Sequence, residues 1–198
     1  LINAGIQVHI GHFPENVVGY DAVVYTAAIS NDNPELVHAK ELGIPTIERS
    51  TFLGELTRCF EDTITIAGTH GKTTTTSMVA LCFLEALKDP SIQVGATLPE
   101  IDGNYLVGNS EYFVIEACEY VESFLKFHPF ATIILNIEED HLDYFKDIEH
   151  IKGSFLKFAN LTDESGFVVI NKEDKECVEI SKDINRKVYT FGFSDSCD

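Results

Sequence analysis

The sequence lacks the features of exported and membrane-spanning chains. Its 198 residues hold only five cysteines, an odd number without a C-x-x-C pair, so we expect no disulfide framework. No apolar run reaches the roughly 18 residues that a membrane-spanning helix needs, and no basic segment precedes an apolar one at the start. We therefore predict a reduced, cytoplasmic protein that does not enter the membrane.

Basic residues are also scarce. The chain has 14 Lys and Arg against 32 Asp and Glu, which gives a formal net charge of −18. Charge of this sign disfavours the phosphate backbone of nucleic acids and offers anionic lipids no basic patch. Neither nucleic acid nor a membrane is therefore expected as a partner. The hydrophobic content of 44% is enough for one large core or two smaller ones.

Short β-branched or aromatic runs alternate with segments of helical period along most of the chain. This alternation is typical of an α/β fold in which mostly parallel sheets are flanked by helices. Glu61 and Asp62 form a polar break before the next strand-like run. We place a domain boundary there, between 1–61 and 62–198.

Local signals differ in strength between segments. Ser50 is expected to cap a helix that runs to about Phe60, because its hydroxyl can accept from the first free backbone N–H groups. The pattern of Glu119–Phe127 predicts another helix. No element is assigned to the glycine-containing, polar segment Val94–Ser110.

The sequence begins with residues typical of a helix end and stops shortly after residues typical of a strand. Leu1–Gly5 is typical of the last turn of a helix with a glycine cap, and Leu1 is not an initiator methionine. Lys187–Gly192 has the pattern of a strand, and the chain stops soon after it. We therefore expect a fragment of a longer protein, without turnover of its own.

A glycine-containing loop, Gly68-Thr69-His70-Gly71-Lys72-Thr73, follows the strand-like run Thr63–Ala67. Glycines let backbone N–H groups close around phosphate oxygens, and the helix that begins after the loop favours an anion at its N-terminus. Lys72 is placed to pair with the β- and γ-phosphates, and the Thr73 hydroxyl to coordinate Mg²⁺. The full P-loop pattern is not met, because Ile66 stands where its first glycine would. We interpret the loop as a shortened nucleotide-binding form.

A second candidate follows the buried-strand pattern Tyr112–Ile115. Glu116 stands at the end of this run, where phosphate-loop enzymes hold a metal-binding acid. On its own, an acid at a strand end is more often an ordinary surface carboxylate. Glu119 would serve in place of Glu116 if the strand ended later.

A third candidate group is Asn136-Ile137-Glu138-Glu139-Asp140-His141-Leu142-Asp143, which follows the strand-like run from Ala131. The carboxyl ends of parallel strands line the ligand crevice in such sheets. His141 is the candidate metal ligand here, with neighbouring carboxylates to orient its ring.

Together, Ala67–Thr75, Glu116 and the pattern from Asn136 to Asp143 resemble the Mur ligase family in content and in order. Ahead of them, His12-Phe13-Pro14-Glu15-Asn16 and Ala28–Glu35 are similar to the family's UDP-sugar-binding domain. The resemblance covers nearly the whole chain. It implies that the first domain is part of a Rossmann-like UDP-sugar domain and the second part of a P-loop ATP-binding domain.

The resemblance also implies roles for single residues. Lys72 would steady the γ-phosphoryl group, Thr73 and Glu116 would hold Mg²⁺, and His141 would help to hold a second ion. The implied catalytic residues are thus Lys72, Glu116 and His141. The residues implied to bind ATP are Gly68, Thr69, His70, Gly71, Lys72, Thr73 and Thr74, and those implied to bind the sugar nucleotide are His12, Ser30 and Asn136.

The reaction that the resemblance implies is ATP-dependent ligation of L-alanine to UDP-N-acetylmuramate in peptidoglycan precursor synthesis. The lactyl carboxylate of the sugar attacks the γ-phosphate to give an acyl phosphate, which the alanine amine then displaces. Cys118 departs from the aspartate of other branches of the family. This departure leaves Glu116 in place and casts doubt on any role copied to position 118.

Two alternatives remain open. A sister ligase would add a preformed peptide or another amino acid to the same acceptor. A regulatory P-loop NTPase would bind partners in a nucleotide-dependent way and consume no carboxylate. The motif from Asn136 to Asp143 argues against the NTPase, because it resembles ligases and not switch proteins.

Overall fold

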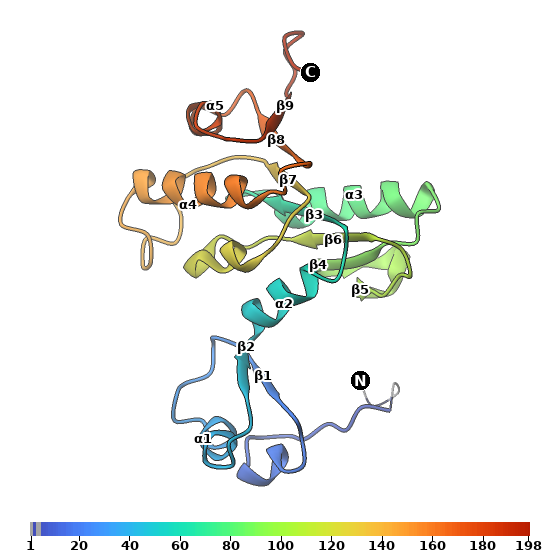
Figure 1. The fold of residues 1–198 in the computed structure, drawn as a ribbon, viewed down its shortest axis with the longest axis vertical. Helices are drawn as coiled ribbons and strands as arrows, with labels where there is room; N and C mark the ends of the chain where they lie inside the picture. The colour runs from blue at the N-terminus through green and yellow to red at the C-terminus, as the bar shows by residue number, and fades with distance from the viewer. Residues whose placement is uncertain (1, 3–4) are drawn as a thin grey trace. The chain divides into compact units, whose positions relative to one another are not determined.

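The computed structural model describes Ile2 and residues 5–198. Most of the helix turn expected over Leu1–Gly5 lies outside these residues. Contacts divide the chain into two compact units, Leu1–Leu53 and Gly54–Asp198. Both units contain parallel strands and helices, so the α/β prediction is confirmed (Figure 1). The assignment of the domains as 1–61 and 62–198 stays a prediction.

The first unit contains a small parallel sheet. Strand β1 (Val23–Tyr25) pairs with β2 (Thr46–Glu48), and α1 (Pro34–Glu41) connects them after the 3-10 helix Pro14–Val17. Pro34 begins α1, and Asn33 caps it by accepting from the N–H groups of Glu35 and Leu36. A proline suits this position because the first helical N–H has no partner within the helix.

The cap predicted for the next helix is wrong. Helix α2 (Arg49–Thr57) already contains Ser50, and the carboxylate of Glu48 accepts from the N–H of Ser50 at 2.9 Å and of Thr51 at 3.3 Å. An anionic side chain satisfies these donors and also favours the positive end of the helix dipole. Glu48 therefore does what the sequence assigned to Ser50.

The second unit is a larger sheet with helices packed on it. Strand order is β5-β4-β6-β3-β7-β8-β9, with parallel pairs except β4 with β5. Its elements are β3 (Asp62–Ala67), α3 (Lys72–Glu85), β4 (Ser91–Leu98), the 3-10 helix Pro99–Ile101, β5 (Gly103–Leu106), β6 (Tyr112–Glu116), the 3-10 segment Tyr120–Lys126, β7 (Ala131–Ile134), α4 (Ile148–Leu161), β8 (Phe167–Asn171), α5 (Lys175–Ser181) and β9 (Lys187–Phe191).

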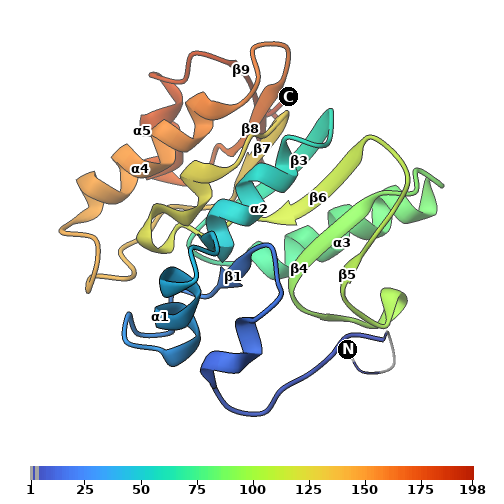
Figure 2. The same cartoon turned by 60° about the horizontal axis from the view of Figure 1, so that its bottom comes forward.

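Strand β3 lies at the centre of this sheet, between β6 and β7 (Figure 2). Ile64 stands opposite both Val114 and Ala131, and all three are buried. Helix α3 packs on β3, β4 and β6 and contributes Ala80 to the same core. Burial on both faces explains why β3 is an almost continuous apolar and β-branched run.

Two segments differ from what the sequence suggests. Val94–Ser110, left without an element, contains most of the β4–β5 hairpin. Glu119–Phe127, expected as a helix, is instead a kinked 3-10 segment with left-handed backbone at Val121 (φ 48°) and Glu122 (φ 54°). Its Phe124 stacks on Phe158 of α4, with ring centroids 4.4 Å apart. The kinked conformation occurs together with burial of the Phe124 ring against α4. The helical spacing of apolar residues in the segment does not predict this packing.

Lys152 of α4 contacts three carboxylates, and two of them belong to α5. Its Nζ lies 2.9 Å from Glu149, 3.2 Å from Glu176 and 2.8 Å from Glu179, and the residue is 5% exposed. Hydrogen bonds to Glu179 and Glu149 raise the pKa of Lys152. The hydrogen bond from Lys152 lowers the pKa of Glu176.

Replacing this lysine should make the fold less sensitive to acid. A carboxylate with a lowered pKa stabilises the fold above its unfolded pKa and loses that contribution as pH falls through the folded value. The Glu176 contribution is thus present at neutral pH and lost below the ordinary value of 4.5. We expect Lys152→Met to lower the melting temperature at neutral pH and to reduce the further drop below pH 4.5.

Thermal melts at neutral pH and below pH 4.5 check this expectation, with Lys157→Met as the control. Lys157 is on the same helix, but its side chain is 64% exposed and lies 3.7 Å from Glu122. Because the lysine is mostly exposed and has, within the described residues, this one carboxylate near it, its loss should lower the melting temperature much less than the loss of Lys152. An acid-induced drop that is unchanged in Lys152→Met would contradict the expectation.

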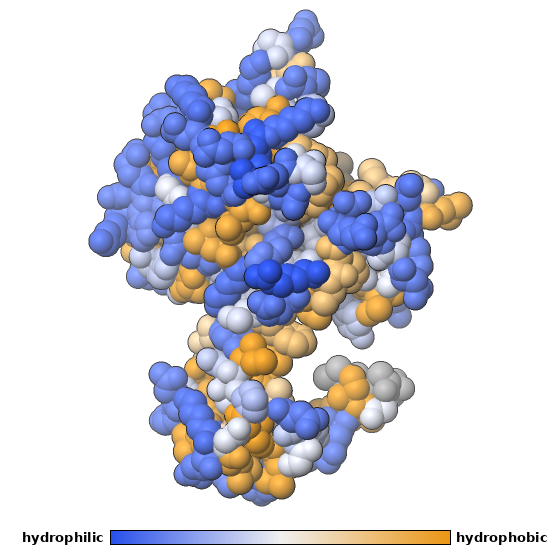
Figure 3. All heavy atoms as spheres, in the orientation of Figure 1, coloured by the Kyte–Doolittle hydropathy of each residue, from blue (hydrophilic) through white to orange (hydrophobic). Residues whose placement is uncertain are grey.

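Within the described residues, no helix has both the length and the apolar character needed to cross a bilayer. The face of the Gly54–Asp198 unit in Figure 3 is largely hydrophilic, with apolar side chains in scattered patches. This surface agrees with the excess of acidic over basic residues.

Candidate active site

Three loops meet at one edge of the larger sheet. Strand β3 pairs in parallel with both β6 and β7, so the carboxyl ends of the three strands lie side by side. The loop Gly68–Gly71 follows β3, the segment from Ala117 follows β6, and the segment from Leu135 follows β7. The three groups of candidate residues predicted from the sequence are therefore brought to the same place.

The loop Gly68–Gly71 depends on the glycines at its ends. Gly68 has φ 145° and Gly71 has φ 83°, values that residues with a Cβ rarely adopt. Gly71 is the N-cap of α3, and no side chain caps this helix end. The first N–H groups of α3 have no partner within the helix, so this helix end offers donors to an anion. This is the arrangement that a nucleotide phosphate requires.

Asn136 braces the loop from the neighbouring strand end. Its Oδ1 accepts from the His70 N–H at 2.7 Å, its Nδ2 donates to the His70 carbonyl at 3.0 Å, and its carbonyl accepts from the Thr69 N–H at 3.1 Å. The Glu138 N–H donates to the Thr69 hydroxyl at 2.9 Å. The role of Asn136 in binding the sugar substrate stays a prediction. The structure adds that both polar atoms of its side-chain amide are hydrogen-bonded to His70 of the loop.

We expect Asn136→Asp to weaken nucleotide binding. The carboxylate still accepts from the His70 N–H, but its other oxygen faces the His70 carbonyl and repels it, since the donor has been lost. A lost hydrogen bond with an unpaired acceptor costs about 1–3 kcal/mol. Urea unfolding and calorimetric titration with Mg²⁺-ADP measure the two effects.

Asn171→Asp is a matched control for this variant. The Asn171 amide also donates to a carbonyl, that of Leu135 at 3.0 Å, and accepts from the Glu173 N–H at 2.9 Å. Neither of the two Asn171 bonds involves the loop Gly68–Gly71. Asn171→Asp should therefore lower the free energy of unfolding and leave the nucleotide affinity unchanged. Equal loss of nucleotide affinity in both variants would contradict the bracing role of Asn136.

Thr73 and Glu116 form a compact pair of oxygen ligands. The Thr73 hydroxyl donates to Glu116 Oε1 at 3.1 Å, and the Gly95 N–H donates to Glu116 Oε2 at 2.8 Å. A Cβ on Gly95 would lie 2.7 Å from that oxygen, so a larger residue here would displace the carboxylate from this position. Gly95 belongs to the segment that the sequence left without an element, and its role here was missed.

The Thr73–Glu116 pair fits Mg²⁺, which prefers oxygen ligands and takes only one or two from a protein when phosphates and water supply the rest. Among the described residues, no group of three or more His, Cys, Asp or Glu side chains is arranged to hold a metal. The assignment of Thr73, Glu116 and His141 as metal ligands stays a prediction.

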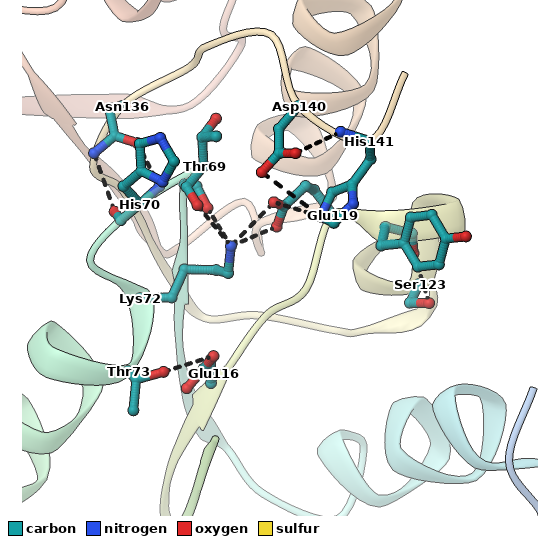
Figure 4. Close-up of polar contacts among 12 residues, drawn as sticks. Thr69, His70, Lys72, Thr73, Glu116, Glu119, Ser123, Asn136, Asp140 and His141 are labelled. Carbon is teal, nitrogen blue, oxygen red and sulfur yellow. Dashed lines mark hydrogen bonds and ion pairs between the residues drawn. The ribbon is translucent and has the colours of Figure 1, made fainter. Parts of the chain in front are cut away.

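Lys72 points away from this pair, toward Glu119 (Figure 4). Its Nζ lies 2.9 Å from Glu119 Oε2 and donates to the Gly68 carbonyl at 2.7 Å and the Thr69 carbonyl at 3.1 Å. Glu119 is only 2% exposed. His141 Nε2 lies 3.7 Å from the same carboxylate. The site thus contains two polar groups, Thr73 with Glu116, and Lys72 with Glu119 and His141.

Tyr120 orients the imidazole of His141 from the segment after β6. The two ring centroids are 4.6 Å apart, and the Tyr120 hydroxyl donates to Asp143 Oδ2 at 2.7 Å. His141 itself has left-handed backbone, with φ 52°. Sequence reasoning did not find Tyr120, because its contacts join two loops that are distant in sequence.

The other predicted substrate residues lie in the first unit. His12 Nδ1 is 2.6 Å from Glu35 Oε2, and the Asn16 amide donates to Glu35 Oε1 at 2.7 Å. Burial opposes ionisation of Glu35, but these hydrogen bonds outweigh it and lower its pKa. The Ser30 hydroxyl donates to Asp32. Both predicted residues are held by a neighbouring carboxylate, and their contact with a sugar nucleotide stays a prediction.

Comparison with known protein families gives two matches. Residues 66–198 match the Mur ligase middle domain, and residues 1–61 match the Mur ligase family catalytic domain. Among curated proteins, UDP-N-acetylmuramate–L-alanine ligases of Acetivibrio thermocellus and Clostridium novyi are each 54% identical over 96% of this chain. The chain spans only 40% and 42% of these two relatives.

Solved structures show the same fold. A UDP-N-acetylmuramate–alanine ligase of Thermotoga maritima superimposes with a TM-score of 0.81 at 30% identity, over 96% of this chain and 43% of that one. A UDP-N-acetylmuramate:L-alanyl-γ-D-glutamyl-meso-diaminopimelate ligase of Neisseria meningitides gives 0.84 at 26% identity, over 96% and 65%.

Proposed function

This chain belongs to the Mur ligase family, and we propose that it contributes the nucleotide site and part of the sugar-nucleotide site of an ATP-dependent ligase that joins L-alanine to UDP-N-acetylmuramate. The amide-forming step would belong to peptidoglycan precursor synthesis. The five cysteines are free, as in a reducing compartment, and we place the protein in the cytoplasm.

The observation that carries this proposal is the meeting of three loops at the carboxyl edge of β3, β6 and β7. The start of α3 offers backbone donors and Lys72, and β6 offers Glu116 at its last residue. The segment after β7 braces the loop Gly68–Gly71 and brings His141 to the same edge. The choice of L-alanine is supported by the curated relatives, which carry that substrate in their names.

The difficulty of the reaction is charge, because a carboxylate has to approach an anionic triphosphate. In this proposal the N–H groups at the start of α3 bind the phosphates, Lys72 offsets their charge, and Thr73 and Glu116 would hold Mg²⁺. Mg²⁺ held there would supply positive charge against the nucleotide. His141 lies across Glu119 from Lys72, on the side where the segment after β7 would meet the acceptor.

Ligation is tested in a protein of the relatives' full length that carries this chain. Mass spectrometry follows the product after incubation with ATP, Mg²⁺, UDP-N-acetylmuramate and a panel of amino acids. We expect an L-alanyl product and ADP, and neither from the Lys72→Ala variant. ADP release that continues undiminished in that variant would overturn the proposal.

The sister ligase that adds a peptide is a second candidate, favoured by the similarity to the Neisseria meningitides structure. Competition between L-alanine and L-alanyl-γ-D-glutamyl-meso-diaminopimelate in the same assay separates the two. We expect the alanine product to dominate at equal concentrations. Dominance of the peptide product would instead assign the chain to the peptide-adding ligases.

A further inference from the structure

Lys72 has a complete set of partners within the chain. An ammonium group has three N–H donors. The acceptors around Lys72 Nζ are the carbonyls of Gly68 and Thr69 and the carboxylate of Glu119, whose two oxygens lie 3.0 Å and 2.9 Å away. With three acceptors for three donors, Lys72 can gain a phosphate partner only by giving up one of these.

Glu119 is the partner that a phosphate would replace. The two carbonyls belong to the loop that carries the lysine, whereas Glu119 comes from a different strand end. Its carboxylate is also the one anion among the three, and a phosphate oxygen would bring the same charge to the same ammonium group. A carboxylate and a phosphate close together, away from bulk water, repel each other strongly.

The backbone next to Glu119 is unusual in a way that points to function. Val121 and Glu122 both have left-handed backbone, with φ of 48° and 54°. Each such non-glycine residue costs energy and persists only where the surroundings fix it. The Phe124 N–H donates to the Cys118 carbonyl at 3.0 Å, and the Phe124 ring is buried against α4. Glu119 is thus held at a turn fixed from both sides.

We propose that Glu119 is a positioning residue, which holds Lys72 in the nucleotide-free protein and competes with the γ-phosphate for it. The inference rests on the nucleotide site proposed above and adds a residue to it. When nucleotide binds, Lys72 exchanges the carboxylate for a phosphate oxygen. Glu119 then faces His141, whose Nε2 is already 3.7 Å from it. Breaking the Lys72–Glu119 ion pair therefore costs free energy, which lowers the affinity for nucleotide.

The proposal is tested with Glu119→Gln, which keeps the shape of the side chain and removes its charge. Calorimetric titration of the chain with Mg²⁺-ATPγS should give at least roughly tenfold tighter binding in the variant, because the competing anion is gone. Urea unfolding without nucleotide should show lower stability, because Lys72 has lost its charged partner. If Glu119 were merely structural, the variant would lose both nucleotide affinity and stability. A gain in affinity together with a loss of stability therefore identifies competition.

A second measurement examines the lysine itself without nucleotide. Acylation of Lys72 by a small amine-reactive ester, followed by peptide mass spectrometry, should be several-fold faster in Glu119→Gln. Glu122→Gln is the matched control, since it removes the same charge from the same segment at a residue that pairs with Tyr144 and Lys157. The control should bind nucleotide like the wild type.

The outcomes separate the two proposals. Unchanged or weaker binding in Glu119→Gln, together with normal binding by the wild type, would overturn the role of Glu119 and leave the nucleotide site standing. Equal gains in the Glu119 and Glu122 variants would also overturn it, because they would indicate a general effect of charge. If the wild-type chain bound no ATPγS, the nucleotide site and the competition would both be refuted.

Discussion

A Lys72→Met chain is expected to bind Mg²⁺-ATP roughly 10- to 100-fold more weakly than the wild type, since hydrogen bonds to charged groups contribute about 1.5–3 kcal/mol. It should also be less stable without nucleotide. The Glu119 carboxylate is 2% exposed and loses its cation, and breaking a buried ion pair in this way costs about 3–5 kcal/mol. Calorimetric titration and urea unfolding measure the two losses.

The double variant Lys72→Met with Glu119→Gln is the control that separates them. Replacing both partners leaves no buried unpaired charge, so stability should return close to the wild-type value. Affinity should not recover to the wild-type value, because the lysine that pairs with phosphate is absent. A single variant as stable as the wild type would show that the ion pair contributes nothing.

A Gly68→Ala chain is the second variant with a large expected effect. At φ 145° a residue with a Cβ is strained by roughly 1–3 kcal/mol. The new Cβ would also lie 3.0 Å from the Leu135 Cβ and 3.3 Å from the Asn136 nitrogen. The loop has to move away from Asn136, so we expect lower stability and loss of nucleotide binding by at least about tenfold.

Substitutions at two other glycines are the controls for Gly68→Ala. At Gly71 a Cβ would meet Leu135 at 3.6 Å, an ordinary contact, so Gly71→Ala tests strain at φ 83° without crowding. Gly153 lies in α4 with open space around it, and Gly153→Ala should stabilise the chain by about 0.4–1 kcal/mol. A Gly68→Ala chain as stable as Gly71→Ala would mean that the crowding costs nothing.

Local sequence predicted the parts of the fold that repeat a simple pattern. The buried run of β3, the helix after it and the loop between them follow from burial on both faces and from the positions of glycine, lysine and threonine. Glu116 was placed correctly at the end of β6, and the structure pairs it with Thr73. Its role with Mg²⁺ stays a prediction.

What sequence did not predict depends on contacts between distant segments. Helical period suggested a helix over Glu119–Phe127, but the kink at Val121 accompanies packing of the segment against α4. Glu119 was considered only as a substitute for Glu116 at the metal, whereas the fold brings it to Lys72. Gly95 lies on a strand with weak local pattern, and its function is visible only as the space that it leaves for Glu116.

The bonds between Asn136, Thr69 and His70 have a structural consequence. They join the loop after β3 directly to the segment after β7, through main-chain as well as side-chain groups. The same segment continues to His141, whose left-handed turn brings its ring against Tyr120. One short stretch of backbone, from Asn136 to His141, therefore links the loop after β3 to the imidazole.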